Sequence, residues 1–187
     1  MAATTRAPTA SAIQTKRLKS PSISAHLRRQ FWFLAVAWLV VIADQLSKVV
    51  AIANLEFARP VVAIPGLLNF TLLYNDSAAF SIGGGATWVF SIISSVATLV
   101  ILWLARKIET TGWALMAGVL LGGVVGNLID RLTRAPGFGV GHVVDFLQLP
   151  FGFPVFNIAD SAIVLIAIFT VIRVMRGDSI GRAKTSK

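Results

Sequence analysis

The sequence has no cysteine, only two histidines and only eight acidic residues in a chain of 187 residues. The lack of cysteine excludes disulfide bonds, thiolate catalysis and cysteine-ligated zinc within this chain. His26 and His142 lie far apart in the sequence, so the histidines do not form a ligand set for a metal ion. We therefore expect that the chain holds no metal and needs no other cofactor.

Charged residues are also scarce, because they make up 13% of the chain while hydrophobic residues make up 56%. A soluble domain carries about 25% charged residues, so a water-soluble globule is disfavoured. The mean hydropathy is +0.77, and the apolar residues form runs close to the ~20 residues that cross a bilayer. The four runs are Phe31–Ala53, Ala86–Ala105, Trp113–Ile129 and Phe156–Ile172.

Positive charge lies at the ends of these runs. The net charge is +9, and most of the 17 lysines and arginines precede the first run, follow the last one or occupy the short loop 106–112. This distribution is typical of the charges that orient membrane helices, and it disfavours a nucleic-acid partner. It predicts cytoplasmic termini and outward-facing loops at 54–85 and 130–155.

The chain divides into a membrane domain and two basic tails. Residues 1–30 are rich in alanine, threonine, serine and proline, which predicts a disordered cytoplasmic tail. Residues 31–176 form the four-helix domain, and residues 177–187 form a second cytoplasmic tail. The first apolar run is too long for the core of a cleaved signal peptide. The fold class is therefore an all-α membrane protein with four transmembrane helices.

The first outward loop has β character. Leu67–Tyr74 follows a Pro65-Gly66 turn and is rich in residues that favour strands. We expect a small extracytoplasmic sheet between the first and second helices.

Polar and ionisable residues inside membrane spans are costly and usually functional. With the predicted orientation and a rise of about 1.5 Å per residue, the polar residues of three spans lie at the same depth, near the outer surface of the membrane. Asp145, flanked by apolar residues in the second outward loop, can reach the same level. This convergence predicts a site. The residues from the spans are Asp44 and Lys48 in the first, Asn127, Asp130 and Arg131 at the end of the third, and Asn157 and Asp160 at the start of the fourth.

Asp145 and Asp160 are the strongest catalytic candidates. Two carboxylates in a pocket of low dielectric constant share a proton, so that one can activate water while the other protonates the substrate. From spacing alone two other interpretations stay open. Asp145 could cap a turn while Asp160 pairs with Arg131, or the acids could carry protons for a transporter subunit. The absence of an inverted repeat disfavours transport.

The other polar residues have structural interpretations. Asp44 and Lys48 are four residues apart on one helix face, which predicts a positioning ion pair. Asp130 next to Arg131 also indicates a structural ion pair. The amides of Asn127 and Asn157 can join helices by hydrogen bonds, or they can hold a peptide carbonyl or orient a nearby aspartate.

Five stretches of the sequence resemble one known family in their order and spacing over roughly residues 30–175. They are Asp44–Lys48, Asn75–Phe80, Gly122–Arg131, Val143–Phe146 and Phe153–Asp160. The family is that of the bacterial lipoprotein signal peptidases, also called signal peptidase II. The resemblance implies an intramembrane aspartic endopeptidase of the bacterial cytoplasmic membrane, with its active site near the outer face. Its expected partners are diacylglyceryl-modified prolipoproteins, cleaved before the lipidated cysteine, and membrane lipid; we expect a monomer.

The resemblance also assigns roles to residues. It implies that Asp145 and Asp160 are the catalytic pair. Asn127, Asp130, Arg131 and Asn157 would line or brace the site, and Asp44, Lys48 and Asn75 would shape it and hold the substrate. A β-cradle and a mobile flanking segment would map onto loop 54–85.

Two positions depart from the family pattern. Ser77 stands where glycine is usual, and Val124 stands where alanine is common. Glycine readily adopts positive φ and serine rarely does, so the backbone at Ser77 need not follow the family.

Overall fold

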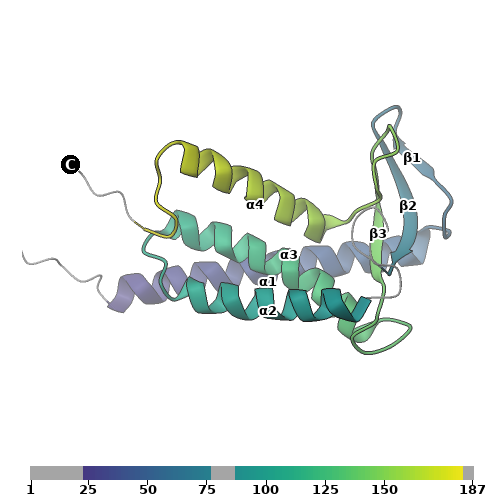
Figure 1. The fold of residues 1–187 in the computed structure, drawn as a ribbon. Coiled ribbons are helices and arrows are strands. Elements are labelled where there is room, and N and C mark those ends of the chain that lie inside the picture. The colour runs from purple at the N-terminus through teal and green to yellow at the C-terminus, as the bar shows by residue number, and fades with distance from the viewer. Residues whose placement is uncertain (1–22, 77–86, 183–187) are drawn as a thin grey trace, which may run out of the picture.

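The computed structural model describes residues 23–76 and 87–182. Within these residues four helices run side by side, and a three-stranded antiparallel sheet stands at one end of the bundle (Figure 1). All four helices are long and apolar enough to cross a membrane, as the sequence predicts. The helices are α1 (Ile23–Asn54), α2 (Thr87–Ala105), α3 (Thr111–Thr133) and α4 (Ile158–Met175), and the strands are β1 (Val61–Ile64), β2 (Leu68–Asn75) and β3 (Val143–Gln148).

Helix α1 begins earlier than the apolar pattern predicts. It starts at Ile23, so residues 23–30, assigned to the disordered tail from sequence, continue the first helix. Gln30 holds the end of this segment against α2, because its Nε2 donates to the carbonyl of Ala105 at 2.8 Å. The predictions for residues 1–22, 77–86 and 183–187 lie outside the described residues; they include the rest of both tails, the position of Ser77 and the part of loop 54–85 that follows residue 76.

The predicted sheet is present, but it is not built from the first outward loop alone. The strand order is β1-β2-β3, and the third strand comes from the loop between α3 and α4. In the register of β2 and β3, Leu73 lies opposite Asp145 and Asn75 lies opposite Val143. Asp145 therefore sits on a strand rather than in an irregular loop.

Helix α3 lies at the centre of the bundle and contacts the other three helices. Its glycines permit this, because a Cβ on Gly118 would lie 2.5 Å from the Phe33 carbonyl oxygen of α1. A Cβ on Gly123 would lie 2.7 Å from the Ala159 carbonyl oxygen of α4. Small residues allow this close backbone packing between membrane helices. It brings the polar residues of α1, α3 and α4 within hydrogen-bonding distance.

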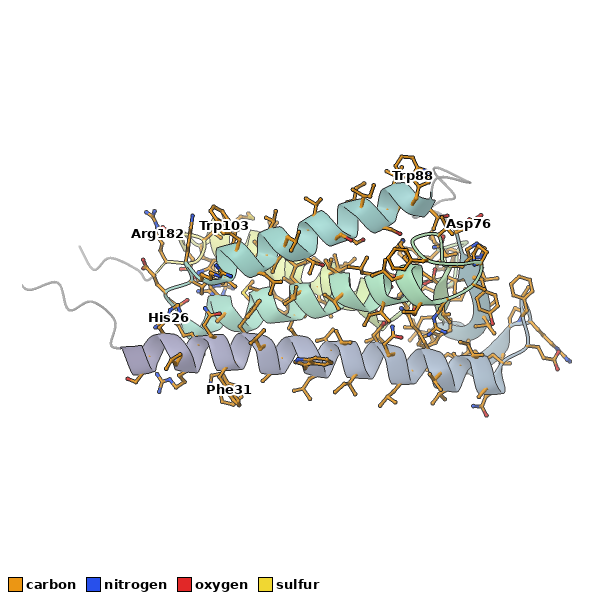
Figure 2. All side chains as sticks on the ribbon, turned by 90° about the horizontal axis from the view of Figure 1, so that it is seen from below. His26, Phe31, Asp76, Trp88, Trp103 and Arg182 are labelled. Atoms are coloured by element: carbon orange, nitrogen blue, oxygen red, sulfur yellow. The ribbon has the colours of Figure 1, made fainter. Side chains whose placement is uncertain are left out.

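The two ends of the bundle differ. His26 and Arg182 lie at one end, and Asp76 and Trp88 lie at the other (Figure 2). The sheet stands at the end that holds Asp76, opposite the described ends of the chain (Figure 1).

Candidate active site

Asp145 and Asp160 approach each other from different elements. Asp145 is on β3 and only 3% exposed, while Asp160 is in the first turn of α4. The Asn157 amide donates to Asp145 Oδ1 at 2.6 Å, and the Asn75 amide donates to Asp145 Oδ2 at 2.9 Å. The Asn127 amide donates to Asp160 Oδ1 at 2.7 Å. Both carboxylates are therefore held by asparagine amides.

Asn157 fixes the start of α4. As the residue before the helix, it accepts a hydrogen bond from the Asp160 backbone N–H at 2.9 Å, and Asp160 Oδ2 accepts one from the Asn157 N–H at 3.2 Å. This reciprocal capping box satisfies two backbone donors of the first turn. It also holds the Asp160 carboxylate at the helix end nearest Asp145. The Asn-x-x-Asp spacing carries this signal, although the sequence prediction did not use it.

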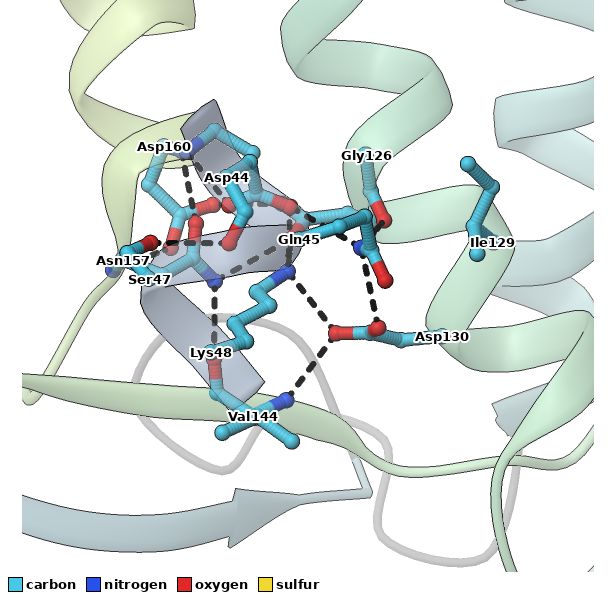
Figure 3. Close-up of polar contacts among 12 residues, drawn as sticks. Asp44, Gln45, Ser47, Lys48, Gly126, Ile129, Asp130, Val144, Asn157 and Asp160 are labelled. Atoms are coloured by element: carbon cyan, nitrogen blue, oxygen red, sulfur yellow. Dashed lines mark hydrogen bonds and ion pairs between the residues drawn. The ribbon is translucent and has the colours of Figure 1, made fainter. Parts of the chain in front are cut away.

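A buried cation lies beneath the acid pair. Lys48 has no exposed side-chain surface and forms ion pairs of 2.8 Å with both Asp44 and Asp130 (Figure 3). Its Nζ also donates to Asn127 Oδ1 at 3.0 Å. Asp44 Oδ1 accepts the Ala159 backbone N–H at 3.0 Å, at the helix end where negative charge is favourable. The predicted pair of Asp44 and Lys48 is present, and it links α1 to α3 and α4.

The predicted pairing of Asp130 with Arg131 is wrong. Asp130 instead pairs with Lys48 and, at 2.7 Å, with Arg134. Adjacent residues on a helix point in different directions, whereas residues four apart share a face. That rule was the signal that could have identified Arg134.

The alternative pairing of Arg131 with Asp160 is not seen among the described residues. Arg131 Nη1 donates to the Asn127 carbonyl at 3.4 Å, and its guanidinium carbon lies 5.8 Å from the centre of the Phe90 ring. Arg131 also lines a groove that Asp145 and Asp160 share.

Gln45 is a further residue of the site that the sequence interpretation missed. Its Nε2 lies 3.0 Å from the Gly126 carbonyl and 3.1 and 3.2 Å from carboxylate oxygens of Asp44 and Asp130. It therefore bridges the same two acids that pair with Lys48 (Figure 3). The pattern of its neighbours gave no reason to single it out.

A groove of about 1040 Å³ opens at the acid pair. Its polar part includes Asp145 and Asp160, and its apolar part continues along α4 through Val164 and Leu165. Toward the sheet it is lined by Phe57 and other apolar residues. A bound molecule could thus contact the acids, the sheet and an apolar helix face together.

The environment of Asp145 favours its protonated form. Burial raises the pKa of Asp145 to about 7, and the nearby charge of Asp160 adds to the increase. Hydrogen bonds from Asn75 and Asn157 oppose it. A carboxyl group that ionises near neutral pH beside a second carboxyl group is suited to acid–base chemistry. A proton path across the bundle has less support, because the four helices carry no acidic residue besides Asp44, Asp130 and Asp160.

Comparison with known proteins identifies the family. The family described as signal peptidase (SPase) II matches residues 36–176. The lipoprotein signal peptidase of Leifsonia xyli subsp. xyli is 44% identical over 142 residues, which are 76% of this chain and 66% of that protein. The lipoprotein signal peptidase of Mycobacterium tuberculosis strain ATCC 25618 / H37Rv is 42% identical over 165 residues, which are 87% of this chain and 81% of that protein.

The fold agrees with these matches. A solved structure described as a bacterial membrane enzyme has a TM-score of 0.70 and 29% identity, and the match covers 83% of this chain and 94% of that one. The chain spans just under two thirds of the Leifsonia relative's length and about four fifths of the Mycobacterium relative's. It therefore belongs to the signal peptidase II family and is a multi-pass peptidase of the bacterial membrane.

Proposed function

We propose that this chain is an intramembrane aspartic endopeptidase that removes signal peptides from prolipoproteins by cleaving before the S-diacylglyceryl cysteine. The observation that carries the proposal is the placement of Asp145 and Asp160. They are joined through Asn157 and lie where a groove meets an apolar helix face. A lipidated peptide needs both kinds of surface, because its acyl chains are apolar and its scissile bond is polar.

The acid pair would act with one shared proton. Asp145, with a pKa of about 7, carries that proton, and the ionised Asp160 takes a proton from water as the oxygen attacks the peptide carbonyl. Asp145 protonates the carbonyl oxygen, and a proton then moves to the leaving amine as the C–N bond breaks. The products are the signal peptide with a new carboxylate and the lipidated cysteine with a free amino group.

Asn75, Asn127 and Asn157 are positioning residues in this proposal, since each donates to a carboxylate of the pair. We place the lipid along Val164 and Leu165 of α4, and the peptide against the sheet. The basic residues of the described chain ends lie opposite the sheet. With the positive-inside rule, this arrangement supports the proposal that the termini lie in the cytoplasm and the acid pair near the outer face.

The direct test is cleavage by purified protein of a diacylglyceryl-modified prolipoprotein and of the same precursor without lipid. We expect kcat/KM to be at least about 10²-fold higher for the lipidated form. Burial of a few methylene groups at about 0.8 kcal/mol each reaches that factor. Equal cleavage of both precursors would contradict the lipid assignment, and cleavage of neither by folded protein would contradict the peptidase assignment.

The rate should depend on pH through Asp145. Because its pKa is raised to about 7, the shared proton is present below that pH and is lost above it. We expect kcat/KM to fall about tenfold per pH unit at alkaline pH. Initial rates between pH 5 and 9, on protein shown to stay folded, would measure this. A rate that stays constant from pH 6 to 9 is incompatible with the assignment.

A further inference from the structure

We infer that Lys48 is a positioning residue that sets the direction of the Asn127 amide, and through it the donor that Asp160 receives. The inference rests on the proposed function, because it concerns the same acid pair. Among the described residues Lys48 forms no ion pair with Asp145 or Asp160. Its charge acts on both acids through space, whereas any effect on the geometry of the pair passes through another side chain.

Asn127 is that side chain. Its Oδ1 accepts from Lys48 Nζ at 3.0 Å and from the Asn157 amide at 3.1 Å, and its Nδ2 donates to Asp160 Oδ1 at 2.7 Å. An asparagine amide can rotate by half a turn and exchange its oxygen for its nitrogen. The rotated amide would direct N–H groups at an ammonium and turn its oxygen toward a carboxylate. Both contacts would then be repulsive.

Lys48 makes this direction hard to reverse. An ammonium carries three donors and no acceptor, and the three acceptors around it are oxygens of Asp44, Asp130 and Asn127. Lys48 is completely buried, so no solvent replaces a lost partner. A neutral polar side chain could adapt to a rotated Asn127, whereas an ammonium cannot.

The other amide is fixed in a different way. Asn157 Oδ1 accepts the Asp160 backbone N–H at the start of α4, so its Nδ2 must face Asp145 and Asn127. A backbone N–H cannot be reversed either. The two amides thus present N–H groups to the two acids, one locked by the helix start and the other by Lys48.

A simpler role for Lys48 is to neutralise the two buried acids beside it, and two variants separate these roles. Lys48→Met leaves Asp44 and Asp130 without their shared cation, which destabilises a buried site strongly. The double variant Asp44→Asn/Lys48→Met restores the charge balance, and the new amide oxygen can still accept the Ala159 N–H. Asp130 keeps its pair with Arg134.

We expect the double variant to recover thermal stability and keep a KM within about threefold of the wild type. Its kcat should stay reduced by about 10²-fold, the loss expected when a reacting group is misplaced by about 1 Å. Arg134→Gln is the matched control, because it removes a cation from Asp130 without touching an asparagine of the site. It should lower the unfolding temperature and leave kcat within about twofold.

Recovery of kcat together with stability in the double variant would overturn the inference, because Lys48 would then act only as a counter-ion. The same kcat loss in Arg134→Gln would also overturn it. If the proposed function is wrong, the result is different: the Asp145→Asn or Asp160→Asn variant keeps its activity. If those variants are inactive and Asp44→Asn/Lys48→Met is fully active, only the role of Lys48 is wrong.

Discussion

Replacing either Asp145 or Asp160 with asparagine should reduce kcat by roughly 10⁴-fold, the upper end of what a general acid or base contributes. Asparagine has nearly the shape of aspartate but can neither take a proton from water nor return one. The fold should survive, because asparagine keeps one side-chain oxygen that can accept the hydrogen bond from Asn157 at position 145 or from Asn127 at position 160. Cleavage rates and unfolding temperatures of the purified variants measure both effects.

The double variant Asp145→Asn/Asp160→Asn should be no slower than the slower single variant, because groups that act as one unit are not additive. Glu56→Gln is the matched control, since Glu56 is an acid with a highly exposed side chain, paired only with Arg59 among the described residues. It should keep wild-type activity. A single aspartate variant that processes the lipidated precursor at more than a tenth of the normal rate would contradict the proposed acid pair.

Replacing Asn157 with alanine should have the second largest effect, because this residue caps α4 and also holds Asp145. Loss of the cap costs about 1–2 kcal/mol, and the buried oxygens of Asp145 and Asn127 lose a donor, at about 1–3 kcal/mol. We expect the free energy of unfolding to fall by roughly 2–5 kcal/mol and kcat to fall about 10²-fold. Denaturant unfolding in detergent and cleavage rates measure the two losses.

Asn157→Ser separates the cap from the contact with Asp145. Serine can accept the Asp160 N–H as a cap, but it is too short to replace the amide that reaches Asp145. We expect the stability loss to shrink to about 1–3 kcal/mol, the cost of the lost donors alone, while kcat stays reduced. Wild-type kcat in this variant would show that the amide of Asn157 does not position Asp145.

Most of the fold could be predicted from the sequence, because long apolar runs and flanking charge are strong local signals. Asp145 was harder to place. Val143–Gln148 is too short to show a clear strand period, and it becomes a strand by pairing with β2, about seventy residues earlier in the chain. The antiparallel partner and the Asn75 contact follow from this long-range pairing, which the local pattern does not encode.

Only the part of the site that depends on local spacing could be predicted from the sequence. Spacing along one helix shows that Asp44 and Lys48 share a face. The rise per residue, counted along each predicted span, shows that the acids of three helices lie at one depth in the membrane. The partners across helices depend on close packing at Gly126, where a Cβ would lie 2.7 Å from Asp44 Oδ2. The close approach of α1 and α3 at Gly126 determines which acids surround Lys48. The rotation of one helix relative to another cannot be predicted from the periodic pattern of either helix.

Mass spectrometry of the products that purified wild-type protein forms from a diacylglyceryl-modified prolipoprotein would identify the bond that is cut. We expect one cut, which leaves the lipidated cysteine as the new amino terminus, and no cut with the Asp145→Asn/Asp160→Asn variant. A cut at any other bond, or the same products from the variant, would contradict it.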